Sequence, residues 1–299
     1  MKARINGAWE DIPCSAQLKS DVADIKAQAR ALLDRLYAAE SAYTTISREL
    51  VPLTATTPSR KAAISKQNMG YAPQGGCTDG TYLYIYIRQS ADEQAGTLMK
   101  IRLSDYTLVK KASLSLYHGN DITYNPDDGL LYVATMYQTE GTSRVDVVDP
   151  VTLTKIKSLY VPVNVSGLAY EPTRRVFVGA NSGTLAKYVL RLDDAGELVH
   201  VGSFSCSESP AMEAGLTAQN LACDGAFIYY LWTARPKMQI DIFNWMGEFM
   251  GSITKTPILY GDYNTEVEFI DKTSRSGFIM GAYVPGNAGV VPIYTFTAT

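Results

Sequence analysis

The sequence predicts a mainly β protein: a five-bladed β-propeller preceded by a long N-terminal α-helix that forms a coiled-coil stem. Two observations lead to this fold class, a heptad pattern of apolar residues near the N-terminus and a strand-turn-strand repeat over the rest of the 299 residues. The domains we expect are an attachment segment at 1–17, a coiled-coil helix at 18–52, a linker with a possible ring-closing strand at 53–69 and the propeller at 70–299.

The stem is predicted from residues 18–50, where an apolar or small residue recurs at alternating spacings of four and three. The a positions are Val22, Ala29, Leu36, Tyr43 and Leu50, and the d positions are Leu18, Ile25, Leu32, Ala39 and Ile46. Branched Ile25 and Ile46 at d favour three or more strands over two. The alternative is a single amphipathic helix packed on its own domain, for which Leu33 would widen the apolar face.

The propeller is predicted from five segments that share one pattern of strand, tight turn and strand. They are residues 75–87, 119–135, 165–180, 219–232 and 266–283, with an aromatic residue at a corresponding place in each: Tyr84, Tyr132, Phe177, Tyr229 and Phe278. Four strands in a repeat of about 45 residues are typical of propeller blades. The last unit lacks a fourth strand, and KAAISKQ (61–67) could pair with it and close the ring.

Composition and charge exclude several classes of function. The net charge is −3 and there is no basic block, so we expect no nucleic-acid partner. No run of about 18 apolar residues is present, so we expect no membrane insertion. The four cysteines, Cys14, Cys77, Cys206 and Cys223, lie far apart, and we interpret them as buried free thiols rather than disulfides or metal ligands.

Polar residues gather where the innermost strand of each repeat is expected to begin. They are Gln74, His118, Asn120, Asp121, Asn164, Ser166, Gln219, Asn220, Glu266 and Glu268. In a closed ring they converge on one face of the central channel, where they could bind sugar hydroxyls or hold a divalent ion, the one cofactor considered. The alternative is that these groups only line the channel and satisfy backbone ends through water.

Few residues could carry catalysis. Tyr117 and His118 could act as acid and base in polysaccharide elimination or hydrolysis. No nucleophile elbow, HExxH, P-loop or Gly-rich nucleotide motif supports a specific enzyme. His200 alternates within a strand, and Asp127 and Asp128 belong to the turn-forming NPDDG, so we interpret all three as structural. The sequence therefore favours a protein without enzymatic activity.

A heptad stem followed by a compact β head resembles phage tail-fibre and receptor-binding proteins. The opening KARINGAWEDI resembles the starts of phage tail and virion structural proteins, here through Ile5, Asn6, Gly7, Trp9 and Asp11. The resemblance implies a protein that is made in the host cytoplasm and becomes part of the virion tail. Its N-terminus would contact other tail proteins, and its stem would form a homo-oligomer, with a trimer favoured over a dimer. Its head would contact host-surface glycan. A polysaccharide-degrading propeller enzyme and a scaffold propeller without a glycan role are the alternatives.

Overall fold

The computed structural model of the chain describes twelve stretches of its 299 residues. They are residues 2–5, 8–11, 21, 24–28, 59–65, 72–88, 95–139, 142–234, 237–255, 263–271, 276–282 and 290–297. The chain divides into two compact units, Met1–Glu49 and Leu50–Thr299.

The first unit begins with a small antiparallel hairpin. Its strands are β1 (Lys2–Ile5) and β2 (Ala8–Asp11), and Ile5 pairs with Ala8 across the intervening Asn6–Gly7. Asn-Gly between two strands is a strong hairpin signal, and residues 1–17 were not predicted to form one.

The structure describes helical backbone at Asp21 and at residues 24–28, which include the predicted d position Ile25. The other seam positions lie outside the described residues: Leu18, Val22, Ala29, Leu32, Leu36, Ala39, Tyr43, Ile46 and Leu50. The long helix and its coiled coil therefore stay predictions.

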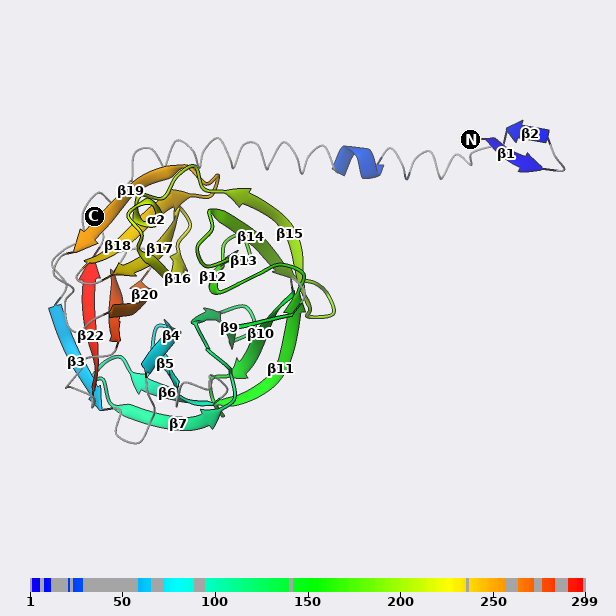
Figure 1. The fold of residues 1–299 in the computed structure, drawn as a ribbon. Helices are drawn as coiled ribbons and strands as arrows, with labels where there is room; N and C mark the ends of the chain where they lie inside the picture. Colours follow the sequence, from blue (N-terminus) through cyan, green and yellow to red (C-terminus); the bar gives the residue numbers. More distant parts are fainter. Residues whose placement is uncertain are drawn as a thin grey trace. The chain divides into compact units, whose positions relative to one another are not determined.

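The second unit consists of four-stranded antiparallel sheets, of which the structure describes five (Figure 1). Sheet one comprises β4 (Ala72–Thr78), β5 (Tyr82–Arg88), β6 (Gly96–Arg102) and β7 (Leu108–Leu114). Sheet two comprises β8 (Asp121–Asn125), β9 (Leu130–Thr139), β10 (Thr142–Asp149) and β11 (Thr154–Val161). Sheet three comprises β12 (Gly167–Glu171), β13 (Val176–Ala180), β14 (Ala186–Leu192) and β15 (Leu198–Ser205).

Sheet four comprises β16 (Thr217–Cys223), β17 (Phe227–Ala234), β18 (Lys237–Asn244) and β19 (Phe249–Lys255). Sheet five comprises β20 (Tyr263–Asp271), β21 (Ser276–Ala282), β22 (Val290–Thr297) and β3 (Ser59–Ser65). A short helix that the sequence analysis did not anticipate, α2 (Pro210–Glu213), precedes sheet four and is capped by the Ser209 side chain.

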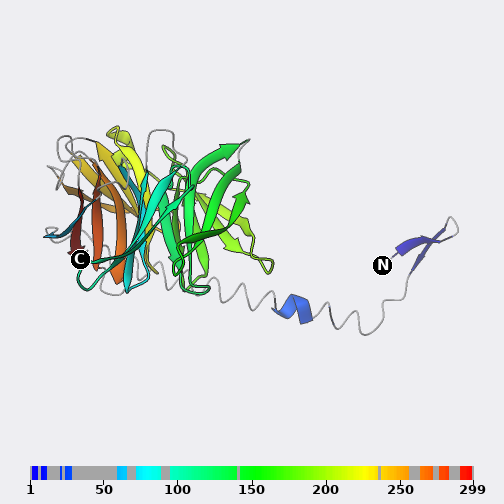
Figure 2. The same ribbon diagram turned by 90° about the horizontal axis from the view of Figure 1, so that it is seen from below.

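The sheets are arranged around a common centre (Figure 1), and Figure 2 shows the same ribbon turned by 90°. The first strand of each sheet contacts the first strand of the next, in the order β4, β8, β12, β16 and β20, and β20 contacts β4. The outer strands β7, β11, β15 and β19 lie at the rim (Figure 1). This radial arrangement of four-stranded sheets is a β-propeller.

The strand expected at residues 61–67 is observed as β3 at Ser59–Ser65, two residues earlier, and it supplies the outer strand of sheet five. It pairs antiparallel with β22, from Val290 opposite Ser65 to Thr295 opposite Ser59. A segment that precedes sheet one in the chain therefore completes the last sheet, which joins the two ends of the ring.

Apolar side chains fill the space between neighbouring sheets, because strands near the centre are buried on both faces. All five residues of β12 and all five of β13 are buried. Between sheets two and three the ring of Phe177 lies 4.7 Å from that of Tyr132 and 4.6 Å from that of Tyr170. Such tilted contacts between aromatic rings stabilise the packing beyond what the burial of their surface contributes.

Sheets one and two approach each other so closely at the centre that a glycine is required. The Gly75 N–H donates a 3.0 Å hydrogen bond to the Gly119 carbonyl. A Cβ atom at position 75 would lie 2.8 Å from the Asp121 main chain, closer than van der Waals contact allows.

Two expectations from composition can be compared with the structure. Cys77, Cys206 and Cys223 are buried free thiols, which confirms that interpretation for these three, while Cys14 lies outside the described residues. Among the helical residues that the structure describes, no helix is long and apolar enough to cross a membrane.

Candidate functional site

Asn120 and Asp121, two of the residues predicted at the channel entrance, bond to the main chain of neighbouring sheets. Asn120 Nδ2 donates to the carbonyl oxygens of Ser166, at 2.8 Å, and Gln219, at 2.9 Å. Asp121 is fully buried, and its Oδ2 accepts from the N–H groups of Leu168 and Leu221 at 2.8 and 2.9 Å. The Asn120 and Asp121 side chains therefore connect β8 to both β12 and β16 by hydrogen bonds at the centre of the ring.

The remaining predicted residues at the entrance have less uniform surroundings. Ser166 is buried and its hydroxyl donates to the Ala180 carbonyl, while Asn220 is fully buried. Gln74 is half-buried in an irregular part of β4, and Asn164 has a buried Oδ1 without a hydrogen-bond partner in the described structure. Glu266 and Glu268 lie in β20, opposite Met280 and Phe278, and their side chains are outside the described residues.

The candidate acid–base pair, Tyr117 and His118, is surrounded by arginines. Arg88 Nη1 lies 3.3 Å from His118 Nδ1, and the Arg144 guanidinium lies 4.0 Å from the centre of the Tyr117 ring. A guanidinium only donates hydrogen bonds, so this contact makes Nδ1 the acceptor and leaves the ring proton on Nε2. The Arg88 contact therefore occupies one ring nitrogen of His118.

Two candidates for chemistry remain, the His200 side chain and a site for a divalent ion. His200 lies in β15 opposite Leu190, with its ring edge-on to Tyr188, as expected of a sheet residue. In the residues whose side chains the structure describes, no three His, Cys, Asp or Glu side chains are placed to hold a metal ion.

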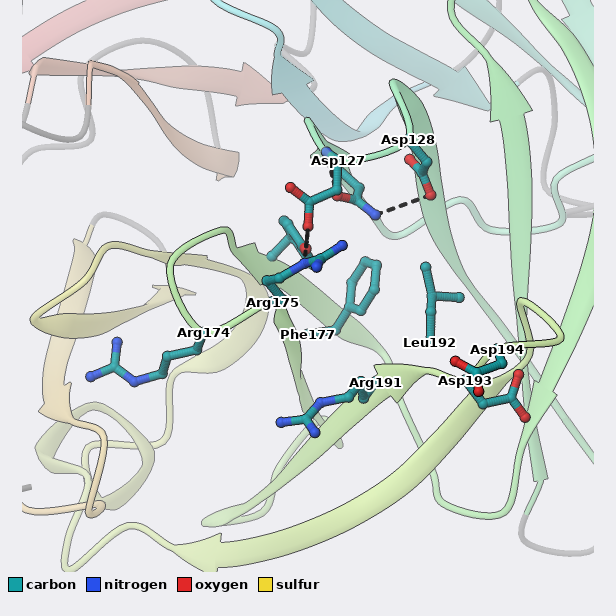
Figure 3. A pocket seen from close by; sticks show the side chains of 11 residues that line it. Asp127, Asp128, Arg174, Arg175, Phe177, Arg191, Leu192, Asp193 and Asp194 are labelled. Atoms are coloured by element: carbon teal, nitrogen blue, oxygen red, sulfur yellow. Dashed lines mark hydrogen bonds and ion pairs between the residues drawn. The ribbon is translucent and has the colours of Figure 1, made fainter. Parts of the chain in front are cut away.

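A pocket of about 560 Å³ opens at the other end of the inner strands, between sheets two and three (Figure 3). We call it the turn-face pocket, because three strand-connecting turns surround it. Its lining consists of Asn125, Asp127 and Asp128 from the β8–β9 turn, Tyr170, Arg174, Arg175 and Phe177 around the β12–β13 turn, and Arg191, Leu192, Asp193 and Asp194 at the β14–β15 turn.

The pocket lies where sheet three departs from the pattern of its neighbours. In sheets one, two and four a tyrosine hydroxyl donates to the carboxylate of its own turn: Tyr84 to Asp79 at 2.8 Å, Tyr132 to Asp128 at 2.6 Å and Tyr229 to Asp224 at 2.9 Å. Sheet three has Phe177 at this place, which has no hydroxyl. Its turn acid, Glu171, accepts instead from the N–H groups of Thr173 and Arg174.

One carboxylate couples the two sheets across the pocket. Asp127 Oδ2 accepts from the Tyr170 hydroxyl and from Arg175 Nε, both at 2.7 Å. The Tyr170 hydrogen bond, followed by that of Arg175, lowers the pKa of Asp127, so this group stays charged as the pH falls. Burial, followed by the bond to Asp127, raises the pKa of Tyr170, which keeps its donor proton.

The backbone of Arg175 is held in the left-handed region, with φ at +56°. A non-glycine residue rarely adopts this conformation, although in the described part of the chain Tyr106, Tyr117, Met136 and Leu153 also do so. Here it directs the Arg175 side chain towards Asp127, as Figure 3 shows.

Sequence reasoning identified Asp127 and Asp128 as turn residues and overlooked the pocket that they line. They do lie in the turn between β8 and β9, but their outer oxygens reach Tyr170 and Tyr132. A signal was present, because Phe177 replaces the usual tyrosine and Arg174–Arg175 replace the small turn residues seen in sheets one and four.

Comparison with solved structures supports the fold alone. A luciferin-regenerating enzyme matches with a TM-score of 0.50 and 11% identity over 80% of this chain and 95% of that chain. The chain has the fold of a β-propeller. Weaker matches are the "beta-propeller domain" of Myceliophteria thermophila Cps50 (Swd1), with a TM-score of 0.39, 13% identity and coverage of 75% of this chain and 65% of that one, and Kuenenia stuttgartiensis hydrazine synthase.

The hydrazine synthase match has a TM-score of 0.42 and 16% identity over 70% of this chain, and the chain spans 55% of that protein's length. No protein-family model matches the sequence, and the search of curated proteins found no match. At these identities the likeness carries no activity or ligand to this chain.

Proposed function

We propose that the chain is a phage tail-associated receptor-binding protein whose propeller head binds host-surface glycan in the turn-face pocket. The observation that carries the binding role is the lining of that pocket, which offers carboxylates and guanidinium groups of fixed geometry around a volume of about 560 Å³. A sugar presents several hydroxyls that both donate and accept, so it matches such a lining. The proposed binding requires no cofactor.

The proposal includes an oligomeric stem and a ring of five blades. In the single chain Ile25 is 65% exposed, as a seam residue must be before its partners assemble. Five four-stranded sheets whose inner strands meet in sequence support the blade count. The hairpin of residues 2–11 would contact other tail proteins, which would place the protein in the virion tail after its synthesis in the host cytoplasm.

Binding, rather than catalysis, is the better-supported role. The alternative, a polysaccharide-degrading enzyme, would use Tyr117 and His118, and Arg88 Nη1 already lies 3.3 Å from His118 Nδ1. Adhesion through several heads needs no catalytic group, because avidity raises the overall affinity of individually weak sites.

Replacing Arg175 with glycine tests the pocket. Glycine tolerates the positive φ, so the fold should persist, while Asp127 loses its charged partner and the pocket loses a donor. We expect glycan binding by the full chain, measured on a glycan array and by titration, to weaken about tenfold. The matched control is Arg102→Ala, which removes another exposed arginine, paired with Asp105 at 3.0 Å in sheet one. Unchanged binding by the Arg175 variant, or no glycan bound by the natural chain, would contradict the proposal.

The stem is tested by the mass of the protein in solution. We expect the full chain to be a trimer and a chain beginning at residue 54, which retains β3 and all later strands, to be a folded monomer. Light scattering measures the mass, and the circular dichroism of the shorter chain reports its folding. A monomeric full chain would instead mean that the helix packs on its own propeller.

A further inference from the structure

The charged groups of the turn-face pocket are unequally paired. Asp127 and Arg175 neutralise each other at 2.7 Å. Arg174 is engaged away from the pocket centre: its Nη1 lies 3.5 Å from Glu171 and 3.0 Å from the Gly225 carbonyl, and its guanidinium covers the Trp245 ring. These two arginines therefore have little charge to offer an incoming ligand.

Among the residues that the structure describes, none forms an ion pair with either of the two carboxylates at the β14–β15 turn, Asp193 and Asp194. Asp193 uses only Oδ1, which accepts from the N–H groups of Ala195 and Glu197, both at 2.9 Å. In the part of the chain that the structure describes, Asp193 Oδ2 and both oxygens of Asp194 have no hydrogen-bond or ion-pair partner. Figure 3 shows both side chains on the same side of the pocket.

Arg191 does not neutralise these carboxylates. Arg191 is exposed, and in the part of the chain that the structure describes it forms no ion pair with Asp193 or Asp194. Figure 3 shows its guanidinium on the Arg174 side of the pocket, away from Asp193 and Asp194. The lining as a whole carries four aspartates and three arginines, and Lys157 of β11 bonds to the Gly196 carbonyl at the β14–β15 turn and lies 3.8 Å from Glu197 rather than pairing with Asp193 or Asp194.

We propose that the turn-face pocket is selective for an amino sugar, whose protonated amine pairs with Asp193 and Asp194. This inference rests on the proposed glycan-binding function and narrows its ligand class. An ammonium group offers three donors and no acceptor, which suits two unpartnered carboxylates. The ring hydroxyls of the same sugar would bond to the Asp127–Arg175 pair. A sugar acid would place a carboxylate beside these aspartates and be repelled.

The test compares glycans that differ only in the amine. Full-length protein is titrated with glucosamine oligomers and with N-acetylglucosamine oligomers of equal length, at about pH 6, where an amine is charged, and at about pH 9, where it is largely neutral. We expect the free amine to bind about fivefold more tightly at the lower pH and to lose this advantage at the higher pH.

Single substitutions assign the effect to the β14–β15 turn. Asp194→Asn, which keeps the shape and removes the charge, should abolish the preference for the amine. The control is Asp105→Asn, because Asp105 occupies the corresponding β6–β7 turn of sheet one and lies outside the pocket.

The outcomes separate the two proposals. Equal binding of amine and N-acetyl sugars, both weakened by Arg175→Gly, would overturn the amino-sugar inference and leave the glycan-binding function standing. Tighter binding of a uronic-acid oligomer would also overturn the inference. If neither amine nor N-acetyl oligomer binds, the inference fails, and if an array then shows no glycan bound at all, the proposed function fails with it.

Discussion

The Asp121→Ala variant will lose most or all of its native structure. The Asp121 carboxylate is fully buried and accepts hydrogen bonds from the N–H groups of Ile122, Leu168 and Leu221. Its removal leaves these buried N–H groups without an acceptor, at about 1 to 3 kcal/mol each, and removes one of the links from β8 to β12 and β16. We expect a loss of about 4 kcal/mol or more in the free energy of unfolding, measured by urea titration with tryptophan fluorescence.

Two further variants are controls for the loss of stability in Asp121→Ala. Asp121→Asn keeps one acceptor oxygen and should fall between alanine and the natural residue. Asp105→Asn changes an exposed turn aspartate of sheet one and should shift stability by less than about 0.5 kcal/mol. If Asp121→Ala costs under about 1 kcal/mol, the aspartate is not the tie between the inner strands that its contacts indicate.

Removing β3 will open the propeller. A chain that begins at residue 69 lacks Ser59–Ser65, so β22 becomes an unprotected edge and sheet five loses its outer strand, although β20 still contacts β4. Several ladder hydrogen bonds disappear, each with a net contribution of about 0.5 to 1.5 kcal/mol. We expect the free energy of unfolding to fall by about 3 kcal/mol or more, with aggregation through the exposed edge.

The chain beginning at residue 54 is the matched control, because it lacks the stem but retains β3. The urea concentration at the midpoint of its unfolding should equal that of the propeller in the full-length protein. If the chains beginning at residues 54 and 69 have equal free energies of unfolding, the pairing of β3 with β22 contributes nothing to stability. That result would contradict the role that we infer from the antiparallel pairing of these two strands.

The strand order of the propeller was largely predictable from the sequence, because short-range signals dictate it. Alternating apolar residues and turn-forming NPDDG or TDG segments set the strands and hairpins, and their recurrence about every 45 residues indicates blades. The Asn-Gly hairpin at residues 2–11 carried an equally local signal that was overlooked.

The roles of the polar residues were less predictable, because they depend on partners far away in the chain. The position of Asn120 and Asp121 at an inner strand entrance was foreseen, but their partners Gln219 and Leu221 are 99 and 100 residues later. Asp127 is a turn residue by its local sequence, and only the packing of sheet two against sheet three brings Tyr170 and Arg175 to it.

The sequence by itself determined the repeat, the class of fold and the place of the ring-closing strand, since hydrophobic periodicity and turn chemistry act over a few residues. Only the tertiary structure decided which polar groups close the centre and which remain open to a ligand. The physical reason is that a carboxylate such as Asp121 or Asp194 has the same chemistry in either setting, and burial and long-range neighbours determine whether its oxygens are satisfied.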